Sequence, residues 1–139
     1  MRRSASIQSY SFYFIEEHPK YLPLVEPLFK EADEGLRELT TSALTLLEVL
    51  VVPYRSGDHL LAARYEAILS RSRGVRMVEI SRKEMRAAAQ LRASTGLKTP
   101  DALQLAVALV AGCRTFLTND RGLPPIPGVR IIQLGVYLP

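Results

Sequence analysis

Short apolar runs alternate with helical segments along most of this chain, and that alternation restricts the fold more than any other feature. The predicted strands span 37–40, 75–80, 115–118 and 129–134. Residues that commonly begin helices precede the segments between them: Ser42, the capping box of Ser81 and Glu84, and Thr99 with Pro100. Strands that alternate with helices are joined by right-handed crossovers into a parallel sheet. We therefore expect an α/β fold with three layers, α/β/α, around a central parallel sheet.

Glycines and prolines predict where the helices end. Gly35, Gly74, Gly96 and Gly112 each follow a helical pattern. Before Gly35, the run Y-L-P-L-V-E-P-L-F-K-E-A contains Pro23 and Pro27, so a kinked or broken helix is predicted there because each proline removes a backbone donor. The helix that Ser42 begins is expected to stop before Pro53.

Length and composition suit one domain over residues 1–139. With 47% hydrophobic and 23% charged residues, the chain has an ordinary globular composition, and no run of about 18 apolar residues predicts a membrane span. A single cysteine, Cys113, suits a reducing cytoplasm. The net charge of +4 permits binding to nucleic acid without establishing it.

Motifs of several enzyme classes are missing from the sequence. His18 and His59 are isolated from other metal ligands, so a zinc site is not expected. The chain has no phosphate-binding loop of the G-x-x-x-x-G-K-[ST] type, no G-x-G-x-x-G and no G-x-S-x-G.

Three acids occur where a shared site is plausible, although each has an ordinary structural explanation. Glu48 lies in a helix that is apolar nearly all round, where a salt bridge or an exposed edge would also accommodate it. Asp101 falls in a first helical turn, which the helix dipole favours. Asp120 follows a strand within N-D-R-G, a composition typical of turns. Thr45, one turn before Glu48, is placed to hydrogen-bond to it.

The combination points to a cation more strongly than any single acid does. Carboxylates at the ends of neighbouring elements repel one another unless a positive ion lies between them. Mg²⁺ and Mn²⁺ prefer oxygen ligands, and either ion can activate a water against a phosphodiester. Lys98 and Arg121 each stand near a predicted ligand and are candidates for contact with RNA phosphate.

Two stretches of the sequence resemble the PIN-domain nucleases, in particular the VapC-like ribonuclease toxins. These are T-S-A-L-T-L-L-E-V-L and, more specifically, T-P-D-A-L-Q-L-A-V-A-L-V-A-G-C followed by R-T-F-L-T-N-D. The resemblance implies that Glu48, Asp101 and Asp120 are the catalytic, metal-binding residues, with Thr118 in support. It also implies cleavage of RNA with Mg²⁺ or Mn²⁺, inhibition by a small antitoxin, and a homodimer.

The resemblance fails at the amino end. F-Y-F-I-E-E-H-P-K-Y is similar to the helix after the family's first strand, which places the family's Asp-Thr pair on Ile7 and Gln8. Residues 1–9 therefore predict an atypical first strand without its acid, unless the reading frame starts upstream. We expect the nuclease to be impaired by this loss. The alternative is a catalytically inactive PIN-like module that binds RNA or an antitoxin; a dimerisation domain without a nucleic-acid role is a third possibility.

Overall fold

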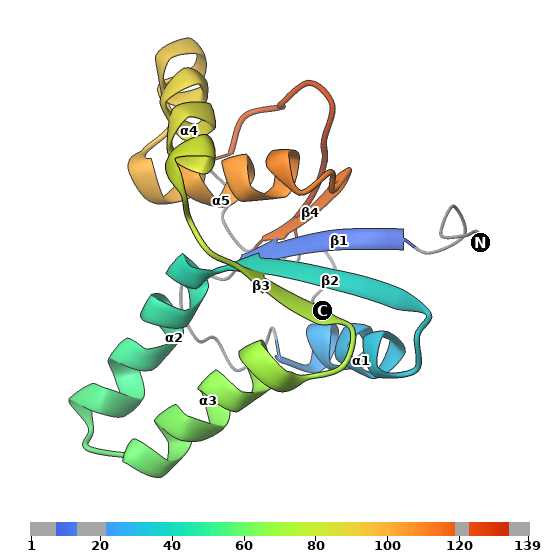
Figure 1. Cartoon of the computed structure of the whole chain (residues 1–139), viewed down its shortest axis with the longest axis vertical. Helices are drawn as coiled ribbons and strands as arrows, with labels where there is room; N and C mark the ends of the chain where they lie inside the picture. Colours follow the sequence, from blue (N-terminus) through green and yellow to red (C-terminus); the bar gives the residue numbers. More distant parts are fainter. Residues whose placement is uncertain (1–7, 14–21, 119–122, 134–139) are drawn as a thin grey trace.

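Five parallel strands form the centre of the computed structural model, which describes residues 8–13, 22–118 and 123–133 (Figure 1). The strands are β1 Gln8–Tyr13, β2 Arg37–Ser42, β3 Val75–Val78, β4 Thr115–Thr118 and β5 Arg130–Gln133. Their order across the sheet is β3-β2-β1-β4-β5, and each neighbouring pair is parallel. The carboxyl ends of all five strands therefore lie along one edge, which is where open α/β sheets bind ligands.

Helices cover both faces of this sheet. They are α1 Leu22–Asp33, α2 Ala43–Arg55, α3 His59–Arg71, α4 Arg82–Thr95 and α5 Thr99–Val110. Figure 1 shows α4 and α5 on one side of the sheet and α1, α2 and α3 on the other. The expected three-layer α/β/α architecture is confirmed. In the described part of the chain, no helix is both long and apolar enough to cross a membrane.

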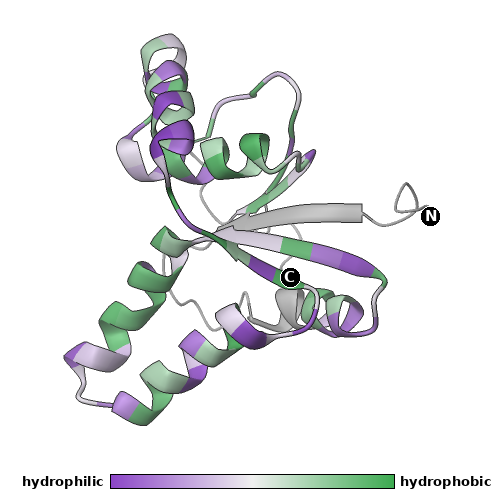
Figure 2. Ribbon diagram, viewed as in Figure 1, coloured by the Kyte–Doolittle hydropathy of each residue, from purple (hydrophilic) through white to green (hydrophobic). Residues whose placement is uncertain are grey.

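Successive residues of β4 pack into two separate cores. Phe116 packs with Leu105 and Ala106 of α5 on one face of the sheet. Leu117, the next residue, packs with Leu39 and Leu69 on the opposite face. This division follows from the strand geometry, because successive side chains point to opposite faces of a sheet. Figure 2 shows the corresponding hydrophobic colouring along α5, whereas α4 is more polar.

Two of the predicted helix starts have the expected capping contacts. The backbone N–H of Leu44 donates to the hydroxyl oxygen of Ser42 at 3.1 Å. The backbone N–H of Ser81 donates to Glu84 Oε1 at 2.9 Å, and the Ser81 hydroxyl donates to the same oxygen. These bonds, led by that of the hydroxyl, lower the pKa of the Glu84 carboxyl. The start of α5 differs slightly from expectation, since Lys98 rather than Thr99 occupies the cap.

The prolines interrupt the helices less than predicted. α1 is one helix from Leu22 to Asp33 with Pro27 inside it, so the predicted break is wrong, whereas the alternative of a kink stays a prediction. Pro23 does not disrupt the helix, because backbone N–H groups in the first turn have no hydrogen-bond partner within the helix. α2 likewise runs past Pro53 to Arg55. Each internal proline costs one backbone bond, and the packing of Leu28, Phe29, Leu46 and Val49 against the sheet opposes that loss.

The first strand lies further along the chain than predicted. Phe12 and Tyr13 were expected in a helix, but they belong to β1, the central strand. Aromatic residues favour strands, and β1 pairs with a partner on each side, which overrides the helical expectation. Gln8 pairs with Arg37 at the amino end of the sheet, whereas Tyr13 pairs with Thr118 at the carboxyl end. Gln8 is therefore at the wrong end of the sheet for the predicted Asp-Thr pair, and Ile7 lies outside the described residues.

Gly74 connects α3 to β3 and is closely packed against α1. Its φ is +78°, and an added Cβ would lie 2.3 Å from the carbonyl oxygen of Ala32. Gly74→Ala should therefore lower the free energy of unfolding by about 3 kcal/mol or more, measured by urea denaturation. Gly96→Ala is the matched control: its φ is +75° with nothing within 4 Å of the added Cβ. The control should cost only about 1–2 kcal/mol. Equal losses for the two variants would contradict the close packing of α1 on this turn.

Candidate active site at the carboxyl edge of the sheet

Glu48 reaches the carboxyl edge because α2 begins directly after β2. Ser42 ends the strand and caps the helix, so no loop separates the two elements. Glu48 lies six residues further, which corresponds to roughly 9 Å along the helix. Its side chain is half-buried, and Oε1 is shielded from solvent. The acid is thus held on a regular helix rather than on a loop.

Asp101 reaches the same edge from α5. Only residues 111–114 separate the end of α5 from the start of β4, so α5 runs back along the sheet and begins near its carboxyl edge. Asp101 is the third residue of this helix and is half-buried. A carboxylate in the first turn is stabilised by the helix dipole.

A buried hydrogen-bond network joins β2, α2 and α5 between these two acids. The Ser42 hydroxyl donates to Gln104 Oε1 at 2.8 Å, and Gln104 Nε2 donates to Thr45 Oγ1 at 3.0 Å. The Thr41 hydroxyl also donates to Thr45 Oγ1, at 2.8 Å. All four side chains are at most 1% exposed. Because the Ser42 oxygen accepts the N–H of Leu44, its single proton is available to Gln104 Oε1, which orients the amide.

Glu48 and Asp101 have matching positions relative to this network. Thr45 precedes Glu48 by three residues, and Gln104 follows Asp101 by three residues. Residues three apart lie on the same face of a helix. The hydrogen bond between Thr45 and Gln104 joins α2 to α5. Glu48 therefore lies one helical turn from this bond on α2, and Asp101 lies one helical turn from it on α5. The predicted bond between Thr45 and Glu48 remains a prediction. Thr45 Oγ1 accepts from Thr41 and Gln104, which leaves its own proton available as a donor.

The remaining predicted site residues follow β4. Thr118 ends that strand at the carboxyl edge and is fully buried. Asp120 and Arg121 come two and three residues later and lie outside the described residues. Within residues 8–13, 22–118 and 123–133, no three His, Cys, Asp or Glu side chains form a group that could hold a metal ion. The complete set of three acids therefore stays a prediction.

The donor atoms of Glu48 and Asp101 suit a hard cation. Both residues offer carboxylate oxygens, which Mg²⁺ and Mn²⁺ prefer. Among the described residues, His59 and Cys113 are placed elsewhere: the His59 ring lies beside Tyr54 at the start of α3, with centroids 5.8 Å apart, and Cys113 is buried in the core under α5. The carboxylate oxygens of Glu48 and Asp101 thus fit Mg²⁺ or Mn²⁺.

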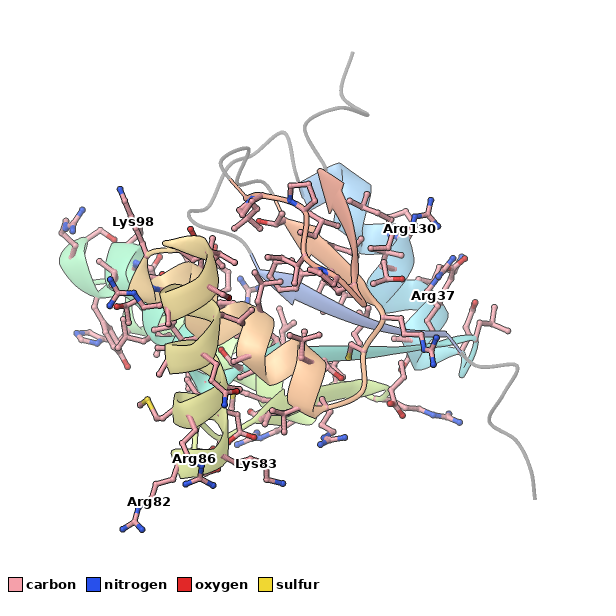
Figure 3. All side chains as sticks on the ribbon, turned by 90° about the horizontal axis from the view of Figure 1, so that it is seen from above. Arg37, Arg82, Lys83, Arg86, Lys98 and Arg130 are labelled. Atoms are coloured by element: carbon pink, nitrogen blue, oxygen red, sulfur yellow. The ribbon has the colours of Figure 1, made fainter. Side chains whose placement is uncertain are left out.

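Lys98 is the N-cap residue of α5, three residues before Asp101. Its side chain is exposed and extends away from the body of the molecule (Figure 3). The segment before it is held in place because Arg92 Nε donates to the carbonyl oxygen of Leu97 at 2.9 Å. Figure 3 shows a second basic group at the start of α4, apart from Lys98, formed by Arg82, Lys83 and Arg86.

Gln104 and Thr41 were not identified from the sequence as site residues. The available signal was Gln104 itself, the single polar residue that follows Asp101 in the helical stretch D-A-L-Q-L-A-V-A-L. Thr41 carries no comparable signal, because a threonine near the end of a strand is ordinary.

Comparisons with known proteins identify the fold. The PIN domain family matches residues 12–128. A toxin–antitoxin complex from Klebsiella pneumoniae is 21% identical, covers 91% of this chain and 97% of that chain, and has a TM-score of 0.57. VapBC2 from Rickettsia felis, bound to a DNA fragment from their promoter, is 18% identical, covers 90% and 98%, and has a TM-score of 0.65. No curated protein sequence matches significantly. Because the family match spans most of its length, this chain belongs to the PIN-domain family.

Proposed function

We propose that this chain is a VapC-like toxin, an endoribonuclease that cleaves RNA phosphodiesters with Mg²⁺ or Mn²⁺. The observation that carries the proposal is the junction between α2 and α5, from which Glu48 and Asp101 each lie one turn outward. Membership of the PIN-domain family supports the nuclease class. We further propose that residues 1–139 form one domain that acts in the cytoplasm.

In this proposal Glu48, Asp101 and Asp120 hold the cation through carboxylate oxygens. When bound, Mg²⁺ or Mn²⁺ supplies an activated water and stabilises negative charge on the phosphodiester. Thr118, buried beside this edge, supports the acid that follows it. Lys98 and Arg121 contact phosphates and orient the RNA strand; both side chains are cationic, and that of Lys98 is exposed.

The activity is proposed to be weak. The resemblance implies four acids, but β1, whose sequence is Q-S-Y-S-F-Y, carries none. The first acid in the sequence after this strand, Glu16, lies outside the described residues. Fewer carboxylates bind a cation less tightly and position the attacking water less well. The same observation favours the alternative, an inactive PIN-like module that retains RNA or antitoxin binding.

The proposed partner is a small antitoxin, and the chain is proposed to form a homodimer. Both comparison structures are toxin–antitoxin assemblies, which supports the first part. Large apolar side chains are exposed on the hairpin of α2 and α3: Leu47, Val51, Val52, Tyr54, Leu60 and Ile68. Exposed apolar stripes on neighbouring helices are typical of protein-binding surfaces. We therefore assign this hairpin surface to the antitoxin.

Asp101→Asn tests the metal-dependent step. Loss of a residue that merely supports a metal ligand costs roughly 10–100-fold in affinity or activity, so loss of a ligand should lower RNA cleavage in Mn²⁺ by more than about 100-fold. Cleavage of labelled single-stranded RNA measures this. Asp33→Asn, the same change at the exposed end of α1, should leave the rate unchanged. Cleavage that survives in Asp101→Asn would reject the proposed site; RNA binding without cleavage in the parent would favour the inactive module.

Lys98→Ala tests the proposed contact with phosphate. The variant should raise KM for RNA with little change in kcat, and the slope of log binding constant against log salt should fall by about 0.7 for one lost contact to a single strand. Lys83→Ala removes the same charge from the separate basic group on α4 and is the matched control (Figure 3). Equal effects of the two substitutions would indicate a general charge effect rather than a contact at Lys98.

Leu60→Asp tests the antitoxin surface. Leu60 is 74% exposed, so the substitution should leave the melting temperature nearly unchanged while placing a charge in the interface. We expect weaker co-purification with the proposed small antitoxin. Met85→Asp changes another exposed apolar residue, 53% exposed and located on α4, and should co-purify normally. Normal co-purification of Leu60→Asp would contradict the assignment of the antitoxin to the surface of α2 and α3.

A further inference from the structure

Gln104 has a chemical character that core packing does not require. It is 1% exposed within a helix whose buried neighbours Leu105, Ala106, Val107 and Ala108 are all apolar. Burying an amide is unfavourable unless its polar atoms are hydrogen-bonded, and here both Oε1 and Nε2 are satisfied by side chains of other elements. A leucine or methionine would fill the same space without that requirement. An amide thus occupies a position where an apolar residue would suffice for packing.

The partners of Gln104 show what the amide accomplishes. Ser42 Oγ is the cap of α2, and Thr45 belongs to the first turn of that helix. The Gln104 side chain of α5 is hydrogen-bonded to both residues, which lie about one turn apart at the start of α2. Two directed bonds restrict sliding and rotation of one helix on the other more strongly than apolar contacts do, because apolar contacts lack direction.

We propose that Gln104 is a positioning residue that sets the separation of Glu48 and Asp101 and thereby the affinity of the site for a divalent cation. Each acid is three residues from a member of the network, Glu48 from Thr45 and Asp101 from Gln104. A shift of α5 relative to α2 would therefore change the distance between the two carboxylates. Cation ligands tolerate little displacement, since Mg²⁺ requires oxygens at about 2.1 Å in near-octahedral geometry. The inference rests on the proposed function and adds to it a residue that does not itself touch the cation.

A paired substitution separates positioning from folding. Gln104→Met alone leaves Ser42 and Thr45 with buried polar atoms lacking their partner, and it should lower the melting temperature by roughly 5 °C or more. Adding Thr45→Val removes one of these stranded groups with little change of shape, so the double variant should recover part of that stability. Affinity for Mn²⁺, measured from the electron paramagnetic resonance signal of the free ion, should remain on the order of 10–100-fold weaker in both variants.

The control for lost stability is Leu69→Ala. Leu69 is 5% exposed in the core between α3 and the sheet, away from the network. This variant should also melt at a lower temperature, yet it should bind Mn²⁺ as the parent does when measured well below its melting temperature. If the role of Gln104 were purely structural, Gln104→Met would likewise melt at a lower temperature and bind Mn²⁺ as the parent does.

The outcomes distinguish this inference from the proposed function. A parent protein that binds Mn²⁺ together with a double variant that binds it equally well would overturn the role of Gln104 and leave the nuclease proposal standing. Failure of the parent to bind Mn²⁺ would overturn the proposed function and this inference with it. Weakened binding in both Gln104 variants but not in Leu69→Ala would establish Gln104 as a positioning residue.

Discussion

The hydrogen bonds of Gln104 to Ser42 and Thr45 connect the carboxyl end of β2 to helices on opposite sides of the sheet. α2 belongs to the layer that contains α1 and α3, whereas α5 belongs to the layer that contains α4 (Figure 1). The two layers are otherwise separated by the sheet, with a distinct apolar core on each face. A site that draws one acid from each layer therefore depends on contacts at the edge of the sheet, where the layers can touch.

The apolar cores and the polar junction have different roles. Burial of residues such as Phe116 and Leu117 stabilises the layers but specifies their relative position weakly, because the hydrophobic effect is not directional. The junction contributes little net stability, since each neutral hydrogen bond adds only about 0.5–1.5 kcal/mol. Its importance lies in direction: a displaced partner leaves a buried polar group unsatisfied, at a cost of about 1–3 kcal/mol. The network thus selects one arrangement of Glu48 and Asp101 from those that the cores permit.

The central strand shows where local sequence was a poor guide. Q-S-Y-S-F-Y includes Gln8, Ser9 and Ser11, which would not be expected of the central strand in a parallel sheet. The structure nevertheless pairs it on both sides, with Ser11 opposite Thr40 and Phe116. Neighbouring strands thus determine the position of β1, and the helix expected at Phe12 and Tyr13 was wrong for that reason.

Patterns within short segments were sufficient for most of the fold. The caps at Ser42 and Ser81, the end of α4 at Gly96 and the parallel three-layer arrangement depend on a few neighbouring residues, and all are confirmed. The positions of Glu48 and Asp101 on helices were likewise predictable, while Asp120 lies outside the described residues. The contact of Gln104 with Ser42 and Thr45 was not predictable, because it joins residues about 60 positions apart and depends on how α5 lies across the sheet edge. Local sequence determines which residues can cap, turn or pair; only the packed structure decides which distant polar groups meet.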